Sequence, residues 1–233
     1  MSTLGQEKLK LFSAPLSMFG MKVIIAVLEK GLEFDLTIVP YSATDGYSPK
    51  HPEVLRINPK RQVPILIQGD LEIFDSTQIF EYLEDLQPNP ALWPQDIRAR
   101  AKARLLEHKS DEVYFPHIIR LMGLQQNLQD PSAITAIEAA TGYYGAMERL
   151  LENNDYFAET FSFADIAFYM AQIFGERMGV PMTDATPQLL MWREHMTARP
   201  SVCTAVSPMV AYLAANKRPV PNFLRNFLAG TQS

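Results

Sequence analysis

The sequence predicts two structural parts, a small α/β domain followed by a larger all-helical domain. Strand and helix patterns alternate over residues 1–86, three prolines fall within residues 87–94, and no strand alternation follows over residues 95–233. Alternating strands and helices are typical of an α/β domain, and a proline-rich stretch is typical of a linker. We therefore expect one domain at 1–86, a linker at 87–94 and an all-helical domain at 95–233.

The first part is expected to contain four strands and two long helices. Apolar runs predict the strands, and amphipathic spacing predicts the helices. Gly31 ends the first helix, and Gly69-Asp70 connects two strands as a hairpin. In chain order we expect a strand at 8–12, a helix at 17–30, a strand at 34–39, a loop at 40–60 with one helical turn at 53–57, strands at 63–67 and 71–74, and a helix at 75–86.

The second part shows only helical patterns. Ser162 and Asp165 form the sequence signature of a capping box, in which the helix-capping serine and the third helical residue satisfy backbone N–H groups reciprocally. Pro116 is expected to kink the helix that contains it. The expected helices lie at 95–123, 131–153, 162–178, 186–198 and 200–214, with an irregular tail at 216–233.

Composition and charge argue against several classes of partner. The formal net charge of −5 disfavours binding to nucleic acid or to an anionic membrane, so the basic run at 98–104 is expected to be a solvated surface. With Cys203 as its single cysteine, the chain has neither an internal disulfide nor a cysteine metal site, which is typical of a reducing compartment. The first residues lack a signal sequence, and no apolar run approaches the ~20 residues that span a bilayer. We expect a cytoplasmic protein without a metal.

Three segments carry a resemblance to a known family. The stretch "NPKRQVPILIQGDLEIFDSTQIFEYLED" (58–85) resembles the glutathione-binding half of the cytosolic glutathione transferases. "SFADIAFY" (162–169) resembles that family's capping motif, and "MWREHMTARPSVCTAV" (191–206) resembles its closing helices. The resemblance covers nearly the whole chain, and it is to the serine-type members (phi-, tau- or theta-like, or a bacterial relative). It implies a thioredoxin-like first domain and a C-terminal helical bundle.

The resemblance implies how the first domain holds glutathione, which would be the co-substrate. The Val63-Pro64 bond would be cis, and the backbone of Val63 would pair with the cysteinyl part of glutathione like an added strand. Ser76 would hold the γ-glutamyl carboxylate at a helix N-terminus, where anions are favoured. Asp75 would hold the γ-glutamyl ammonium, or it would only cap the helix together with Gln78, and the two roles are compatible.

Two further residues fall where related enzymes bind the glycine end of glutathione. Lys50 suits a carboxylate as a point charge, although it could equally be a solvated surface lysine, and His51 is its rival for that role. Gln62 lies at a fixed offset from Pro64 and is expected to bind the backbone of glutathione.

The resemblance places the catalytic residue in "LFSAPLSMFGMKV" (11–23), where Ser17 aligns with the serine of the serine-type enzymes. A helix N-terminus and a donating hydroxyl both stabilise a thiolate, so Ser17 would activate the thiol of glutathione without losing its own proton. Its ordinary alternative is a plain helix cap, and Ser13 is the alternative donor. Phe12 stands near the position of the donor in tyrosine-type members, so a tyrosine-type mechanism is disfavoured. Positions 13–20 contain no cysteine, which members that exchange disulfides through their own thiol need there.

The second substrate would lie between the domains. On the helix after the linker, the aromatic and methionine side chains of Tyr114, Phe115, Ile118 and Met122 suit a small hydrophobic electrophile, although the same spacing also fits core packing. The resemblance thus predicts a homodimeric glutathione transferase. Two alternatives stay open: a glutathione-dependent ether-cleaving or dehalogenating enzyme on the same fold, and a non-enzymatic interaction protein.

Overall fold

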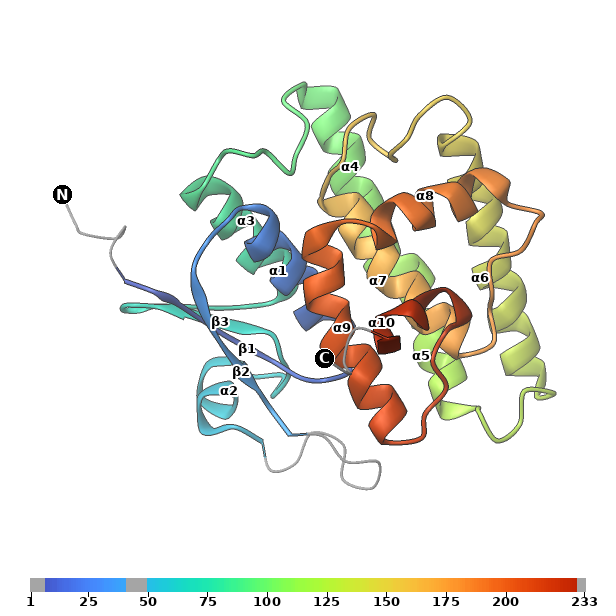
Figure 1. Cartoon of the computed structure of the whole chain (residues 1–233), viewed down its shortest axis with the longest axis horizontal. Helices are drawn as coiled ribbons and strands as arrows, with labels where there is room; N and C mark the ends of the chain where they lie inside the picture. Colours follow the sequence, from blue (N-terminus) through green and yellow to red (C-terminus); the bar gives the residue numbers. More distant parts are fainter. Residues whose placement is uncertain (1–6, 41–49, 230–233) are drawn as a thin grey trace.

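The computed structural model describes residues 7–40 and 50–229, which form a four-stranded sheet and a domain built of helices. Figure 1 shows the sheet lying beside the helical domain. The strand order is β2-β1-β3-β4. β1 runs parallel to β2 and antiparallel to β3, which is antiparallel to β4. The predicted fold class, an α/β domain followed by a helical one, is confirmed. The strands are β1 (Leu9–Ser13), β2 (Phe34–Ile38), β3 (Ile65–Gln68) and β4 (Leu71–Phe74).

Alternating side chains of the sheet face two separate apolar clusters. Leu11 belongs to the large core that the sheet shares with α1 (Met18–Glu29) and α3 (Ser76–Leu86). Phe12 points to the other face, where it joins a small cluster that contains Val54 of α2. This helix, α2 (Pro52–Ile57), is the helical turn that the sequence predicts within the long loop.

The helical domain is organised around α7 (Phe163–Arg177), in which every residue from Phe163 to Gly175 is buried. Its N-terminus has the capping box predicted for Ser162 and Asp165. α7 contacts α1 as well as the helices of its own domain, so it belongs to the core of both parts. The other long helices are α4 (Ile97–Lys109), α5 (Phe115–Gly123), α6 (Pro131–Leu150), α8 (Pro187–Thr197) and α9 (Pro200–Ala215).

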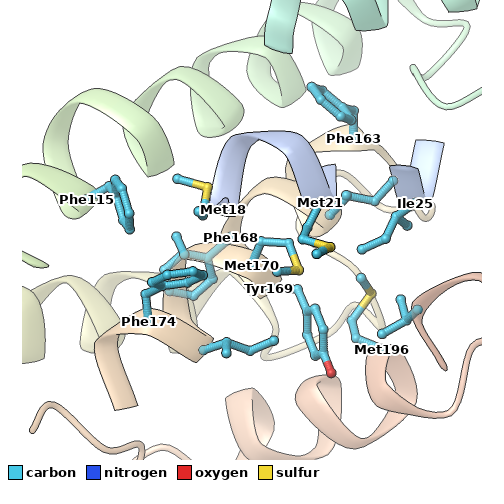
Figure 2. Packing of buried hydrophobic residues seen from close by; sticks show 14 of the residues in the cluster. Met18, Met21, Ile25, Phe115, Phe163, Phe168, Tyr169, Met170, Phe174 and Met196 are labelled. Atoms are coloured by element: carbon cyan, nitrogen blue, oxygen red, sulfur yellow. The ribbon is translucent and has the colours of Figure 1, made fainter. Parts of the chain in front are cut away.

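The two domains share one continuous core. Figure 2 shows Met18, Met21 and Ile25 of α1 lying among aromatic and methionine side chains of the helical domain. Flexible thioethers fill irregular gaps between packed elements, which suits a junction between two domains. The interface therefore places the N-terminus of α1 directly against the helices α5 and α7.

Two expectations differ from the structure. The helix expected at 95–123 is interrupted, because a π-helical turn, η1 (Ser110–Tyr114), separates α4 from α5. The tail expected to be irregular contains a 3₁₀ turn, η2 (Asn222–Leu224), and a short helix, α10 (Asn226–Ala229). Leu224 is fully buried in the main core, so apolar burial orders this segment.

The predicted linker, residues 87–94, lies between α3, which ends at Leu86, and α4, which begins at Ile97. Part of the loop expected at 40–60, residues 41–49, lies outside the described residues. Within 7–40 and 50–229, no helix has the length and apolar character needed to cross a membrane.

Candidate functional site

The candidate site residues of the first domain gather at one end of the sheet. The strand register sets Ser13 beside Ile38, and Phe12 opposite Ile65. It also sets Phe74 opposite Ile65. The segments that follow β1, β2 and β4, and the one that precedes β3, therefore all leave the sheet at the same end. Ligands of open α/β sheets bind at such an edge.

A cavity of about 570 Å³ lies at this end, between the sheet domain and the helical domain. Its volume is in the range of small-molecule sites in proteins. The first domain contributes Leu16, Ser17, Met18, Phe19, Val39, Lys50, His51, Val54, Arg61, Gln62 and Val63 to its wall. The helical domain contributes Phe115, Ile119, Met122, Gln125, Phe174, Arg177, Met178 and Arg218.

Ser17 lies on the cavity wall as the N-cap of α1. Its Oγ accepts a hydrogen bond of 3.0 Å from the backbone N–H of Gly20. A hydroxyl that accepts in this way still has its own hydrogen to donate. The serine is 7% exposed, so a group in the cavity can reach it while bulk water is largely excluded. The helix-cap interpretation of Ser17 is confirmed, and its role as a donor toward a bound thiol stays a prediction.

Ser13, the alternative donor, lies at the end of β1 and is fully buried. It is not among the residues that line the cavity. Its Oγ has no hydrogen-bond partner within the part of the chain that the structure describes. The geometry therefore favours Ser17 over Ser13 as the group that faces a ligand.

The cavity includes Lys50, Gln62 and Val63, three of the residues predicted to bind glutathione, and also His51, the rival of Lys50. His51 caps α2, because its Nδ1 accepts from the N–H of Glu53 at 3.2 Å. The Val63-Pro64 peptide is cis, as the resemblance implies. Pro64 itself is buried behind the wall.

A side-chain network shapes the turn before Val63. Asn58 Nδ2 donates to the carbonyl of Gln62 at 2.7 Å, and Asn58 Oδ1 accepts from the N–H of Lys60 at 2.9 Å. Between them Arg61 adopts a left-handed backbone with φ 56°. Asn58 therefore fixes the path of the segment that carries Gln62 and Val63, while the ladders of β3 begin only at Ile65.

Asp75 and Ser76 lie at the N-terminus of α3. Asp75 is the N-cap, and its Oδ1 accepts from the N–H groups of Thr77 at 3.0 Å and Gln78 at 3.3 Å. Ser76 is 3% exposed. Neither residue lines the cavity, although the hairpin register places them at the same end of the sheet as Val63. The capping role predicted for Asp75 is confirmed, and the ligand roles of both residues stay predictions.

The four residues predicted to line the second-substrate region separate into two pairs. Phe115 and Met122 line the cavity, and Phe115 packs edge-on against Phe19 with ring centroids 5.5 Å apart. Tyr114 and Ile118 are fully buried and lie outside the cavity wall. The predicted contact of Tyr114 with a substrate is therefore not supported by its position.

The phenol of Tyr114 serves the core of the helical domain instead. It shares a hydrogen bond of 2.7 Å with Tyr144, and Tyr144 donates to the carbonyl of Val180 at 2.8 Å. Burial raises the pKa of both phenols, so they remain neutral. The π-helical turn at Ser110–Tyr114 changes the helical phase here, which turns Tyr114 inward and leaves Phe115 facing the cavity.

Several wall residues did not follow from sequence patterns. They include Arg61, Ile119, Gln125, Phe174, Arg177, Met178 and Arg218. Arg177 is the last residue of α7, and Arg218 follows α9. Their helices were predicted, but only the packing of the two domains shows that these ends meet the cavity. For any metal, the described residues contain no group of three or more His, Cys, Asp or Glu side chains placed to bind one.

Comparisons with known proteins agree with this architecture. The family model of the glutathione S-transferase N-terminal domain matches residues 11–91, and that of the C-terminal domain matches residues 112–200. A probable glutathione S-transferase, parC of Nicotiana tabacum, is 30% identical over 198 residues, which is 82% of this chain and 85% of the tobacco protein.

Two further relatives differ in how much of each chain is matched. Glutathione S-transferase 1 of Dianthus caryophyllus is 41% identical over 103 residues, so the match spans 43% of this chain and less than half, 44%, of the carnation protein. The solved structure of Ure2p in complex with glutathione superimposes with a TM-score of 0.75 at 21% identity, over 88% of this chain and 95% of that one.

The chain belongs to the glutathione S-transferase family. The family predicted from the sequence is thus confirmed. The likeness to Ure2p supports the fold alone.

Proposed function

We propose that this protein binds glutathione at the end of the sheet, activates its thiol through Ser17 and transfers the glutathionyl group to a small hydrophobic electrophile. The observation that carries the proposal is the position of Ser17. Its hydroxyl caps α1 on the wall of a cavity that Lys50, Gln62 and Val63 also line. One cavity therefore combines an activating helix end with the predicted glutathione contacts.

Two effects lower the pKa of a thiol placed at Ser17. The free thiol has a pKa of about 8.5, so only a small part is thiolate at neutral pH. The N-terminal N–H groups of α1 favour an anion, and helix N-termini lower thiol pKa values to within ~3.5 to 7.5. The Ser17 hydroxyl, which accepts from Gly20, donates its own hydrogen to the sulfur.

The contacts to the rest of glutathione follow the order of the chain. The backbone of Val63 pairs with the cysteinyl unit, and Gln62 with Lys50 bind toward the glycine carboxylate. Asp75 and Ser76 bind the γ-glutamyl end at the N-terminus of α3, where a carboxylate is favoured. Register and shared position at one end of the sheet support these assignments.

The electrophile lies against the helical wall of the cavity. Phe115, Met122, Phe174 and Met178 give this wall an apolar, adaptable surface. The thiolate attacks an electrophilic carbon, a C–S bond forms, and the leaving group departs with the bonding electron pair. The thiol proton passes to solvent before the attack.

A calorimetric titration tests the first half of this proposal. Glutathione is added to the protein near neutral pH in two buffers with different ionisation enthalpies. Thiol activation releases a proton, so the apparent binding heats should differ between the buffers. Equal heats would show that the thiol is bound without activation, and absence of binding at millimolar glutathione would overturn the proposal.

Ser17→Ala tests the second half. The variant should keep glutathione affinity within a few-fold but lose proton release and at least 90% of turnover, roughly the ≥ tenfold loss that follows when one stabilising donor is removed. Loss of the cap should also cost about 1 kcal/mol of stability, so folding is checked by thermal melting. Ser132→Ala, at an exposed serine in the first turn of α6, is the matched control and should change neither property. Normal turnover by Ser17→Ala would overturn the role of Ser17.

We further propose that the protein acts in the cytoplasm as a homodimer, as is typical of the family. Sedimentation equilibrium should then give about twice the chain mass of 26.3 kDa. A monomer at micromolar concentration would contradict this assignment.

A further inference from the structure

Arg61 lies on the cavity wall in a backbone conformation that arginine rarely adopts. Its φ angle is 56°, in the left-handed region. A residue with a Cβ atom is strained there because the Cβ comes too close to the following carbonyl oxygen, whereas glycine accepts this region readily. Strained backbone of this kind clusters at ligand-binding sites, where the surrounding structure holds it in place. Arg61 is therefore a candidate for a functional role in the cavity.

The described part of the chain contains four residues other than glycine with a positive φ angle. Glu159 and Lys217 are not among the residues that line the cavity. Asp75 is the N-cap of α3, where the γ-glutamyl end of glutathione is proposed to bind. Arg61 lies two residues before Val63, which is proposed to pair with the cysteinyl unit. Two of the four strained residues thus belong to the proposed glutathione site.

Asn58, which is only 4% exposed, holds Arg61 in the left-handed conformation. The carbonyl of Asn58 accepts from the N–H of Arg61 at 2.7 Å. The Asn58 side chain also bonds both neighbours of Arg61, since Oδ1 accepts from the N–H of Lys60 at 2.9 Å and Nδ2 donates to the carbonyl of Gln62 at 2.7 Å. Relaxation of the backbone at Arg61 would break these bonds, so the turn maintains the strain.

The guanidinium of Arg61 has no hydrogen bond, ion pair or ring contact within the part of the chain that the structure describes. By contrast Arg56, the other arginine of the first domain, pairs with both Glu53 and Glu72. The planar guanidinium of arginine presents a fork of N–H donors that matches the two oxygens of a carboxylate. The strained turn therefore brings an unpaired carboxylate-binding group to the cavity wall.

Glutathione has one carboxylate at each end. The γ-glutamyl carboxylate is proposed to bind at Asp75 and Ser76, which leaves the glycine carboxylate for the wall that carries Gln62. Gln62 is uncharged, and Lys50 on the same wall is engaged in another interaction. A carboxylate that leaves water binds most strongly to a charged donor. Arg61, adjacent to Gln62 and on the same cavity wall, supplies such a donor.

We propose that Arg61 binds the glycine carboxylate of glutathione, and that the left-handed turn which holds Arg61 at the cavity lowers the stability of the fold. This inference rests on the proposed function and names the residue that selects the glycine end of the co-substrate. A ligand without a charge at that end loses the contact with Arg61. Its thiol and its γ-glutamyl end bind as they do in glutathione.

Two ligands that differ by one charge test the contact: glutathione and its monoethyl ester at the glycine carboxylate. Calorimetry measures the Kd of both for the unmodified protein and for Arg61→Gln. The unmodified protein should bind glutathione at least about three- to tenfold more tightly than the ester, as expected for one charge-assisted contact at an exposed side chain. Arg61→Gln should lose about this factor for glutathione and bind the ester within twofold of the unmodified protein. Arg61→Lys keeps the charge and should lose less than Arg61→Gln.

Arg61→Gly removes the side chain and the strain together. It should lose as much affinity for glutathione as Arg61→Gln. Without ligand it should melt about 2 to 4 °C above the unmodified protein, because relief of the strain outweighs the extra freedom that glycine gives the unfolded chain. Lys217→Gly is the matched control, since Lys217 is exposed, has a φ angle of 51° and is not among the residues that line the cavity. It should raise the melting temperature similarly and leave both affinities unchanged.

The other outcomes separate this inference from the proposed function. If Arg61→Gln binds glutathione normally, or weakens both ligands equally, Arg61 does not bind the glycine carboxylate, and the inference is overturned while glutathione binding stands. If Arg61→Gly melts no higher than the unmodified protein, the turn does not lower stability, and that part of the inference is wrong. If the unmodified protein binds neither ligand at millimolar concentration, the proposed function fails and the inference fails with it.

Discussion

Gly20 lies where two serine hydroxyls approach the backbone of α1. A Cβ atom at this position would stand 2.1 Å from Ser13 Oγ and 3.0 Å from Ser17 Oγ. Cβ atoms essentially never come as close as the first distance, and the second is tighter than most real contacts, so a methyl group here must displace the Ser13 hydroxyl and press on that of Ser17. The N–H of Gly20 is also the group that holds Ser17 Oγ at 3.0 Å. The glycine therefore positions the Ser17 hydroxyl, the proposed donor to the thiol, through its backbone alone.

Gly20→Ala is expected to lower kcat about tenfold or more while the KM for glutathione changes little, because the donor is displaced and the other contacts remain. Steady-state kinetics with glutathione and any accepted electrophile measure the two parameters. Gly142→Ala is the matched control: this helical glycine has open space around its Cα, and alanine there should stabilise α6 by about 0.5 to 1 kcal/mol.

A double variant separates displacement of Ser17 from general damage. Ser13→Ala removes the hydroxyl nearest to the added methyl group, and that hydroxyl is itself buried without a partner among the described residues. Ser13→Ala/Gly20→Ala should therefore recover part of the lost kcat. No recovery, with normal thermal stability, would show that the crowding at Ser13 is not what displaces Ser17.

At the scale of residues, the sequence predicted the sheet-side wall better than the helical wall. Ser17 and Val63 follow from the family resemblance of short local motifs, and Gln62 from its fixed offset to Pro64, so residues near these motifs were placed in advance. Tyr114 and Arg177 depend on helical phase and on how two domains meet. A π-helical turn at Ser110–Tyr114 rotates the first inward, and no local pattern brings the second to the cavity.

At the scale of elements, α7 depends on a single carboxylate at its start. Asp165 is fully buried and accepts from the N–H of Ser162 at 2.9 Å, Ser162 Oγ at 3.0 Å, the N–H of Phe157 at 3.2 Å and Trp192 Nε1 at 3.0 Å. Burial raises the pKa of Asp165 to about 6, and these donors oppose that rise. The carboxylate thus joins the start of α7 to α8 and to the preceding loop.

Asp165→Ala is expected to destabilise the protein by roughly 3 kcal/mol or more, because four buried donors lose their acceptor and each unsatisfied group costs about 1 to 3 kcal/mol. Urea unfolding at pH 7 measures the change. Asp96→Ala removes another helix cap, whose bonds to Arg98 and Ala99 are exposed, and should cost only about 1 kcal/mol. Equal costs for the two variants would mean that Asp165 is no more than an ordinary cap.

Element positions were largely predictable because each long helix carries its own start signal and apolar period. The capping box at Ser162 and the helical turn at 53–57 are examples that the structure confirms. The 3₁₀ turn and short helix of the tail were not predicted, since their order comes from burial of Leu224 in a core assembled from distant residues. Local sequence does not contain that information.

At the scale of the whole molecule, a buried group of three charges connects the domains. The fully buried ammonium of Lys22, on α1, lies 2.8 Å from Glu107 Oε1 and 2.5 Å from Asp111 Oδ2 of the helical domain. Thr77 Oγ1 of α3 donates to the same Glu107 oxygen at 2.8 Å. Two carboxylates thus compete for one ammonium in a region with little water.

The competition shifts the titration of two of these groups. Burial raises the pKa of Asp111 to about 6; the ammonium of Lys22 opposes the rise and the charge of Glu107 adds to it. Burial alone would lower the pKa of Lys22, but the two carboxylates outweigh it and the pKa is raised. Lys22 therefore stays charged at neutral pH, and Asp111 is the member that takes up a proton as pH falls.

The raised pKa of Asp111 determines whether its contribution to stability increases or decreases with pH. Between about pH 4 and pH 6 the folded protein binds a proton at Asp111 that the unfolded chain has already released. The stabilisation that Asp111 contributes is therefore fully present below the pKa of this residue in the unfolded chain. It is lost as the pH rises through the pKa of Asp111 in the folded protein. Asn at position 111 mimics the protonated acid at every pH and has no such dependence.

Asp111→Asn should therefore gain stability relative to the unmodified protein as pH rises from 4 to 7. The gain should be on the order of 1 to 3 kcal/mol, since one pKa unit corresponds to about 1.4 kcal/mol. Urea unfolding of both proteins at several pH values measures the difference, which cancels the contributions of all other groups. Glu112→Gln, which removes the adjacent exposed carboxylate, is the matched control for loss of an acidic side chain in the same turn. Parallel curves for Asp111→Asn and the unmodified protein would show that Asp111 ionises equally when folded and unfolded, so that Lys22 compensates both carboxylates fully. A rising difference would instead identify the contact between the domains as the part of the molecule that weakens as pH rises from 4 to 7.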